Sequence, residues 1–310
     1  MRVGILTFHA ADNYGAVLQA RALVEILRSL GHDAHVIDYA PEYLIRPFRL
    51  WRKDGWKHPV GIAKNLAGSL DYARRKKGFR TFREAMYPVP YPPEGFDAVV
   101  FGSDQIWNTA LDGGELLWFA QGPAFDHTRN IAYAASSGSV PLPKGIDFGR
   151  FHRLGVREPQ LQAELQARGL PSTLVLDPVL LAGRDVMDTM AAPCPVQGRY
   201  VVCYEVIDNP RIREIASDFG LPLVRIASNP RLGGCKKYVP GEFISLIRGA
   251  EHVVATSFHA VALAKLYGVD VVFPPSGTRK DDRILNILSP ETDLDALRAQ
   301  SLRFLKEALE

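Results

Sequence analysis

Apolar positions along the 310-residue chain switch between strand-like and helix-like spacing from the first residues onward. Residues 3–8 form a short apolar run, and a helical pattern through Leu18, Leu23 and Leu27 follows, with Gly31 as its expected C-cap. Residues 35–39 then predict a second strand, which completes a βαβ unit whose right-handed crossover belongs in a parallel sheet. The chain therefore opens like a Rossmann-type domain.

The same alternation continues beyond this first unit. The other predicted strands are residues 98–101, 130–134, 173–176, 200–206, 223–226, 252–255 and 269–273. The other predicted helices are residues 160–168, 211–219, 241–248 and 260–267. Alternating strands and helices at this density indicate parallel, doubly wound sheets.

The length of the chain favours two domains, because single hydrophobic cores usually stop growing at about 250–300 residues. Two prolines and two glycines interrupt residues 183–198, so we expect the crossover between two sheets there. The predicted organisation is an N-terminal Rossmann-like domain, residues 1–187, and a C-terminal Rossmann-like domain, residues 188–310, with the last helix returning to the N-terminal domain. The fold class is α/β, with two parallel sheets facing a central cleft.

The net charge of +3 conceals a basic segment. Residues 46–83 hold twelve Lys or Arg and two Asp or Glu, an excess of 12 − 2 = 10 positive charges, with Trp51, Trp56 and Phe79 between them. We predict a mostly helical, solvent-facing insertion whose cationic face approaches an anionic membrane surface or a lipid-linked diphosphate. A solvated charged face without a partner is the alternative.

Composition narrows the class of protein further. No stretch approaches the roughly 20 apolar residues that span a bilayer, and the first residues do not form a signal peptide, so we predict a cytoplasmic protein, with peripheral contact at the inner face of the membrane as the further expectation. The three cysteines lack CxxC or zinc-type spacing, so no disulfide, metal or other cofactor is expected. No nucleic-acid partner is predicted, and the oligomeric state stays open.

Ligands of open parallel sheets bind beyond the carboxyl ends of the strands, where this chain places several polar loops. After the first strand, Asn13, Tyr14 and Gly15 precede a helix N-terminus that can hold an anion, although N-capping by Asp12 or Asn13 explains the same pattern.

Two further loops follow predicted strands. The loop at residues 101–108 gathers hydrogen-bonding side chains and an indole, which suits recognition of a sugar or phosphate, with the indole as a stacking face; a capped turn with a core tryptophan is the alternative. Its candidate binding residues are Ser103, Asp104, Gln105, Trp107 and Asn108. A serine-rich turn after the next strand adds Ser136.

Two residues at predicted strand-to-helix junctions carry the candidate chemistry. Arg157 could bind a carboxylate or phosphate through two parallel hydrogen bonds, or form an ordinary salt bridge with Glu158. His259 stands at the first turn of a helix, two residues after Ser257, in a position suited to proton transfer; a structural histidine is the alternative.

These motifs, in their order along the chain, resemble the polysaccharide pyruvyl transferase family. The resemblance rests on TFHAADNYGAVLQA, GSDQIWN, YAAS, VRE, LDPVLL and EFISLIRGAEHVVATSFHA, which span nearly the whole chain. It implies an arrangement similar to two-domain (GT-B-like) glycosyltransferases. It also implies transfer of a pyruvate unit from phosphoenolpyruvate to two hydroxyls of a sugar in a surface-glycan precursor, free or lipid-linked, which forms a pyruvate ketal.

The same resemblance assigns roles to particular residues. His259 matches the family's histidine and becomes the candidate acid or base, Arg157 the candidate donor anchor, and Arg283 a second anchor. The chain departs from the family pattern at Ala260, where glycine is usual, and at Ser257, where one branch has arginine. These departures leave two alternatives: a glycosyltransferase that uses a nucleotide sugar, or a non-catalytic member that binds glycan or phosphoenolpyruvate.

Overall fold

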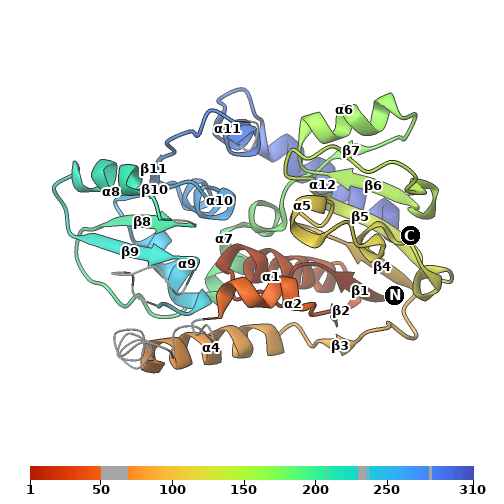
Figure 1. The fold of residues 1–310 in the computed structure, drawn as a ribbon, viewed down its shortest axis with the longest axis horizontal. Helices are drawn as coiled ribbons and strands as arrows, with labels where there is room; N and C mark the ends of the chain where they lie inside the picture. Colours follow the sequence, from red (N-terminus) through yellow and green to blue (C-terminus); the bar gives the residue numbers. More distant parts are fainter. Residues whose placement is uncertain (50–68, 207, 230–234, 236, 279–280) are drawn as a thin grey trace.

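The computed structural model describes residues 1–49, 69–206, 208–229, 235, 237–278 and 281–310. Within these residues the strands form two sheets in which every pair is parallel (Figure 1). The seven-stranded sheet has the order β3-β2-β1-β4-β5-β6-β7, and the four-stranded sheet the order β11-β10-β8-β9. The predicted α/β class with two parallel sheets is confirmed.

The first sheet contains β1 (Arg2–Leu6), β2 (Asp33–Asp38), β3 (Val89–Pro90), β4 (Ala98–Phe101), β5 (Arg129–Ala135), β6 (Arg153–Val156) and β7 (Thr173–Leu174). The second contains β8 (Val201–Glu205), β9 (Leu223–Ala227), β10 (His252–Ala255) and β11 (Asp270–Val272). The strand order reverses between β1 and β4 in the first sheet and between β8 and β10 in the second. The loops that leave these strands therefore lie at the switch points where parallel sheets bind ligands.

The α-helices are α1 (Tyr14–Ser29), α2 (Glu42–Ile45), α4 (Ser69–Glu84), α5 (Thr109–Asp112), α6 (Pro159–Ala167), α7 (Pro178–Met190), α8 (Pro210–Ser217), α9 (Pro240–Arg248), α10 (Phe258–Tyr267), α11 (Asp282–Leu288) and α12 (Leu294–Leu309). Short 3₁₀ helices are η1 (Arg46–Phe48), η3 (Leu116–Phe119), η4 (Pro123–Phe125) and η5 (Phe148–Arg150). No helix in these described parts of the chain is long and apolar enough to cross a bilayer.

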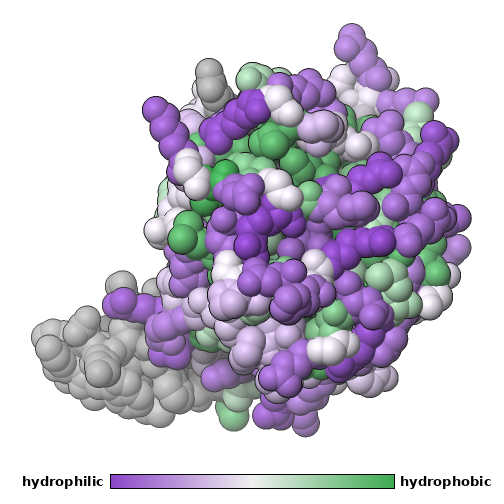
Figure 2. All heavy atoms as spheres, turned by 90° about the vertical axis from the view of Figure 1, so that its right-hand side faces the viewer, coloured by the Kyte–Doolittle hydropathy of each residue, from purple (hydrophilic) through white to green (hydrophobic). Residues whose placement is uncertain are grey.

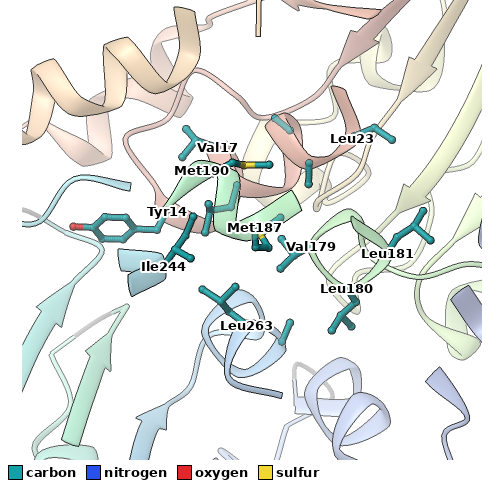
Figure 3. Packing of buried hydrophobic residues seen from close by; sticks show 14 of the residues in the cluster. Tyr14, Val17, Leu23, Val179, Leu180, Leu181, Met187, Met190, Ile244 and Leu263 are labelled. Atoms are coloured by element: carbon teal, nitrogen blue, oxygen red, sulfur yellow. The ribbon is translucent and has the colours of Figure 1, made fainter. Parts of the chain in front are cut away.

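Helix α7 joins the two sheets and was not predicted. The pattern of prolines and glycines between residues 183 and 198 suggested a connector, but α7 occupies its first half and continues across Gly183, whose φ of 79° marks a kink. Its buried side chains pack between α1 on one side and α9 and α10 on the other (Figure 3). The chain leaves the first sheet at β7 and enters the second at β8, so α7 forms the shared core of the two halves.

The final helix, α12, packs on the first sheet after the second sheet is complete. It contacts β7 and α7, and the ring of Phe304 lies 6.1 Å from that of Tyr133 on β5. A side chain at Gly155 of β6 would meet Phe304, so the glycine permits this close packing. Figure 2 shows the face of the molecule that carries the first sheet, where hydrophilic side chains predominate and apolar ones gather in smaller patches.

The described part of the basic segment is helical, as predicted, and faces solvent on one side, but its other side is buried. Helix α4 runs along both halves of the molecule and contacts α1 and α9 (Figure 1). Phe79 is buried in the core, and the buried Arg75 donates hydrogen bonds to the backbone oxygens of Asp12 at 2.7 Å and Ser228 at 2.9 Å. The inner face of α4 therefore ties the two halves together, while Trp51 and Trp56 lie outside the described residues.

Candidate active site

Arg157 directly follows β6 and is almost completely buried, with its side chain 2% exposed. Its Nη1 donates to Asp177 Oδ2 at 2.9 Å and its Nε to Glu158 Oε1 at 3.1 Å. Although burial disfavours the charge, Glu158, Asp177 and Asp104 hold the pKa of Arg157 above its usual range. The pairing with Glu158 that the sequence left as the alternative is present, but it uses only one part of the guanidinium.

The third nitrogen of that guanidinium makes an ion pair but no hydrogen bond within the described residues. Nη2 of Arg157 is buried, lies 3.7 Å from Asp104 Oδ1, and has no hydrogen-bond partner in the described part of the chain. The ring of Phe258 covers the guanidinium at 4.7 Å. Because buried N–H groups without a partner are costly, this nitrogen suits a ligand that supplies an acceptor.

Asp177 connects Arg157 to His259. Its fully buried carboxylate accepts from the backbone nitrogen of Val179 at 3.0 Å through Oδ1, which caps α7. Its Oδ2 binds Arg157 and lies 3.4 Å from His259 Nε2. Burial alone would raise the pKa of Asp177, but the opposing effects of His259 and Arg157 lower it to about 2. This carboxylate was not among the residues predicted for the site, although the LDPVLL motif contains it.

His259 belongs to the first turn of α10 and touches the first half of the molecule at Gly15. A Cβ at Gly15 would lie 2.2 Å from His259 Nδ1 and 2.6 Å from Cγ, closer than atoms can approach. Gly15 is therefore required by the imidazole and not by a turn. Gly15 and His259 form a direct contact between the two halves.

The loop after β4 is organised largely by its own hydrogen bonds. Ser103 is buried and donates to Gln19 Oε1 at 2.7 Å, and Asn108 Nδ2 donates to Gln105 Oε1 at 2.8 Å. Asp104 accepts from the backbone nitrogen of Gln105 at 2.8 Å and faces Arg157. Of the five residues predicted from this loop, Asp104 is the one that reaches the Arg157 cluster.

Trp107 does not present a stacking face. Its side chain is fully buried, its Nε1 donates to the backbone oxygen of Trp118 at 3.0 Å, and its ring stacks on Phe119 at 5.8 Å. The prediction of an accessible indole is wrong, because a position one residue past a buried aliphatic can pack inward as easily as outward. The alternative of a capped turn with a core tryptophan is the one that the structure adopts.

Tyr14 is likewise a packing residue. It is fully buried, its ring stacks on Phe243 at 4.5 Å, and its hydroxyl donates to the backbone oxygen of Tyr238 at 2.7 Å. Burial raises the pKa of Tyr14 far above its ordinary value, with a smaller opposing effect from Arg75. Its predicted contact with a substrate is therefore wrong, and it joins the first half to the second.

The remaining loop residues lie near the site in supporting roles. Asn13 caps α1 through Oδ1, which accepts from Ala16 N at 3.3 Å, and its Nδ2 donates to Ser228 Oγ at 3.2 Å. Ser136 is buried, and its Oγ accepts from Gly138 N at 3.1 Å. Ser257 stands partly exposed at the N-cap of α10. The capping alternative for Asn13 is thus correct.

A small pocket opens beside Arg157, between α7, α11 and the start of α10. It is lined by Arg157, Asp177, Leu180, Phe258, Asn286 and Ile287, among other residues. Asn286 Nδ2 is buried without a hydrogen-bond partner among the described residues, as is Nε of Arg283, one turn earlier on α11. Burial and the charge of Arg157 lower the pKa of Arg283. Unpartnered donors of Arg157 and Asn286 therefore belong to residues that line an otherwise largely apolar pocket.

The charges of this cluster limit what it can bind. Two guanidinium groups, Arg157 and Arg283, interact with three carboxylates, Asp104, Glu158 and Asp177. Within the described residues, no group of three or more His, Cys, Asp or Glu is placed to hold a metal ion. Arg157 Nη2 and Asn286 Nδ2, which belong to residues that line the pocket, are unpartnered donors suited to an acceptor group, and Glu158 Oε2 is an unpartnered acceptor of the same cluster.

The segments that follow β6, β7 and β10 bring a buried guanidinium, carboxylate and imidazole together, a combination typical of sites that bind an anion and move a proton. The chain belongs to the polysaccharide pyruvyl transferase family, whose model matches residues 13–273, and the protein is a transferase. The family resemblance inferred from the motifs is thereby confirmed. No curated protein matches the chain.

Solved structures with a similar course of the chain are distant in sequence. A putative UDP-N-acetylglucosamine 2-epimerase from Listeria monocytogenes is 11% identical, with 99% of this chain and 89% of that chain covered and a TM-score of 0.48. The UDP-GlcNAc 2-epimerase of Methanocaldococcus jannaschii is 12% identical, with 100% of this chain and 93% of that chain covered and a TM-score of 0.48. The E. coli heptosyltransferase WaaC is 14% identical, with 100% of both chains covered and a TM-score of 0.39.

Proposed function

We propose that this transferase moves a pyruvate unit from phosphoenolpyruvate onto two hydroxyls of a sugar in a surface-glycan precursor and forms a pyruvate ketal. The observation that carries the proposal is the shared carboxylate of Asp177, which lies between a guanidinium with an unpartnered nitrogen and the imidazole of His259 in a member of this family. Arg157 Nη2 and Asn286 Nδ2 supply donors for the anionic groups of the donor substrate.

The reaction balances with the groups at hand. A proton added to the methylene carbon of phosphoenolpyruvate makes its central carbon electrophilic, and a sugar hydroxyl adds there and loses its proton. Phosphate then leaves with the electrons of its C–O bond, and the second hydroxyl closes the ring and loses a second proton. His259 is the proposed proton carrier, and Asp177 stabilises the imidazolium that proton uptake creates.

The net charge of the cluster favours a protonated His259 when the donor is bound. Two guanidinium groups against three carboxylates leave a formal deficit of one positive charge before the donor binds. An anionic donor adds to that deficit, and a protonated His259 reduces it. Binding of the donor and formation of the acid that protonates it therefore support each other.

Donor identity is tested by thermal shift with phosphoenolpyruvate, inorganic phosphate and UDP-N-acetylglucosamine, because a ligand that binds the folded state stabilises it in proportion to RT ln(1 + [L]/Kd). We expect stabilisation by phosphoenolpyruvate above that by phosphate. Stabilisation by the nucleotide sugar alone would instead support the glycosyltransferase alternative.

Turnover is tested with the His259→Asn variant. We expect it to bind phosphoenolpyruvate and to melt near the wild-type temperature, yet to lose about 10²- to 10⁴-fold in rate, the usual contribution of a general acid or base. His152→Asn, a change at an exposed histidine before β6, is the matched control and should keep the wild-type rate. Wild-type turnover in His259→Asn would refute the proton-transfer role.

The proposed acceptor is a sugar, free or linked to a lipid, handled at the inner face of the membrane. The outer face of α4 keeps Lys76, Lys77 and Arg80 exposed, which supports a peripheral contact with anionic lipid. Sedimentation with anionic liposomes at low and high salt tests this contact, and its absence at low salt would contradict it.

A further inference from the structure

Asp177 differs from an ordinary helix cap because its two oxygens have separate tasks. Oδ1 accepts the backbone nitrogen that begins α7, which holds the carboxylate in place. Oδ2 faces Arg157 at 2.9 Å and His259 at 3.4 Å, one from the first half of the molecule and one from the second. The cap alone requires only Oδ1, so the cap does not account for the second oxygen.

We propose that Asp177 is a positioning residue that places the proton of neutral His259 on Nε2, leaves Nδ1 as the nitrogen that exchanges a proton with the substrate, and holds Arg157 so that Nη2 faces the donor. The substrate named here rests on the proposed function, whereas the geometry of the three side chains does not. The assignment adds a residue to the site and states which imidazole nitrogen reacts.

Burial of individual atoms supports the choice of nitrogen. His259 Nε2 is buried, and no contact within the described residues meets the full hydrogen-bond geometry for it; Asp177 Oδ2, 3.4 Å away, is the acceptor beside it. The exposed tenth of this side chain therefore lies on its other atoms. A carboxylate beside Nε2 favours the tautomer that carries the proton there, since a proton on the other nitrogen would leave two lone pairs facing each other. Nδ1, the other ring nitrogen, faces Gly15.

The same carboxylate also fixes which part of Arg157 remains available. Nε is taken by Glu158 and Nη1 by Asp177, and the planar guanidinium then has one orientation in which Nη2 is left without a partner. Loss of the Asp177 carboxylate would release Nη1 and allow the guanidinium to turn. One side chain therefore controls both the anion-binding and the proton-transferring group.

The experiment compares wild type with Asp177→Asn, which keeps the shape and a capping oxygen but removes the charge. Two-bond ¹⁵N–¹H NMR spectra, recorded at a pH high enough for neutral rings and assigned with His259→Asn, report the tautomer of His259. We expect the Nε2–H form in the wild type and its loss in Asp177→Asn, with a fall in kcat on the order of 10²- to 10⁴-fold and a higher KM for phosphoenolpyruvate.

The matched control is Glu205→Gln. Glu205 is also a fully buried carboxylate between two cationic groups, Arg213 at 2.6 Å and Arg225 at 2.9 Å, but it belongs to the end of β8. Its loss should lower the melting temperature without changing the His259 spectrum or kcat. This separates the loss of a buried charge from the loss of positioning.

Three outcomes overturn the proposal: a wild-type His259 that carries its proton on Nδ1, an Asp177→Asn variant that retains kcat, and an Asp177→Asn variant that retains the Nε2–H signature. The first needs no variant at Asp177 and therefore remains a test even if Asp177→Asn fails to fold. If the tautomer changes as expected while the wild type transfers no pyruvate, the positioning role stands and the proposed function fails.

Discussion

Substitution of Gly15 by alanine tests the contact between the two halves at the site. Gly15 is the second residue of α1, where alanine is intrinsically favoured over glycine by about 0.5–1 kcal/mol. The added Cβ would lie 2.2 Å from His259 Nδ1, whereas ordinary contact begins at 3.4 Å. The ring or the backbone must therefore move by 3.4 − 2.2 = 1.2 Å.

Overpacking of this kind costs about 1–3 kcal/mol, so it outweighs the gain in helix propensity, and the free energy of unfolding should fall by roughly 1 kcal/mol. The effect on catalysis should be larger, because a misplacement of about 1 Å can cost 10²-fold in rate. We expect Gly15→Ala to lose about 10²-fold in kcat. Urea denaturation and phosphate release measure the two quantities.

The comparison variant is Gly4→Ala, on β1 within the first sheet. Its added Cβ would lie 2.8 Å from Cδ1 and 3.1 Å from Cγ1 of Ile37, so it should destabilise the fold while leaving turnover normal. In the double variant Gly15→Ala/His259→Ala the contacts with Nδ1 and Cγ are gone and a 3.0 Å contact with the Cβ of residue 259 remains, so its loss of stability should be smaller than the sum of the two single losses. Wild-type turnover in Gly15→Ala, or an additive loss of stability in the double variant, would refute the steric argument.

Two further variants test the charges of the molecule. Arg157→Lys keeps the charge, but one ammonium group cannot bind Glu158, Asp177 and a ligand together, so the KM for phosphoenolpyruvate should rise at least about 10-fold. The surface variant Arg168→Lys is the control and should leave this KM unchanged. An unchanged KM in Arg157→Lys would exclude Arg157 as the donor anchor. Burial, with a smaller effect of Glu115, raises the pKa of Asp112 from 3.8 to about 6. The folded state then binds this proton more tightly than the unfolded state, so stability falls as pH rises through that window. Asp112→Asn should accordingly raise the free energy of unfolding by about 1–2 kcal/mol at pH 8 and by almost nothing at pH 4, measured by urea denaturation, whereas an equal gain at both pH values would contradict the assignment.

The local spacing of apolar and polar residues was sufficient to predict most of the strands and helices that form the two sheets and their layers. The predicted strands at residues 98–101 and 252–255 match β4 and β10, because short β-rich runs bounded by polar loops have no competing interpretation. It also placed Arg157 and His259 at strand-to-helix junctions, where they lie. What it did not predict was α7, because the interruption by Gly183 looks like the end of an element when its neighbours are unknown.

The errors within the site have a common cause: burial depends on contacts between residues far apart in the sequence. Trp107 lies in a polar loop and Tyr14 directly follows one at the start of α1, yet their rings pack on partners from other elements. Asp177 looks like a routine cap, since Asp before Pro is common at helix starts. Only the fold shows that its second oxygen faces an arginine 20 residues earlier and a histidine of the other half.

The placement of His259 against Asp177 is set by helix packing and not by the loops that carry them. Asp177 begins α7, His259 lies in the first turn of α10, and the two helices pack along each other through side chains such as Val179 and Leu263 (Figure 3). Arg75 of α4 adds a second tie between the halves at Asp12, three residues before Gly15. A change in either contact alters the distance between imidazole and carboxylate, so substitutions in this shared core should affect turnover more than equally destabilising ones in the core of either sheet alone.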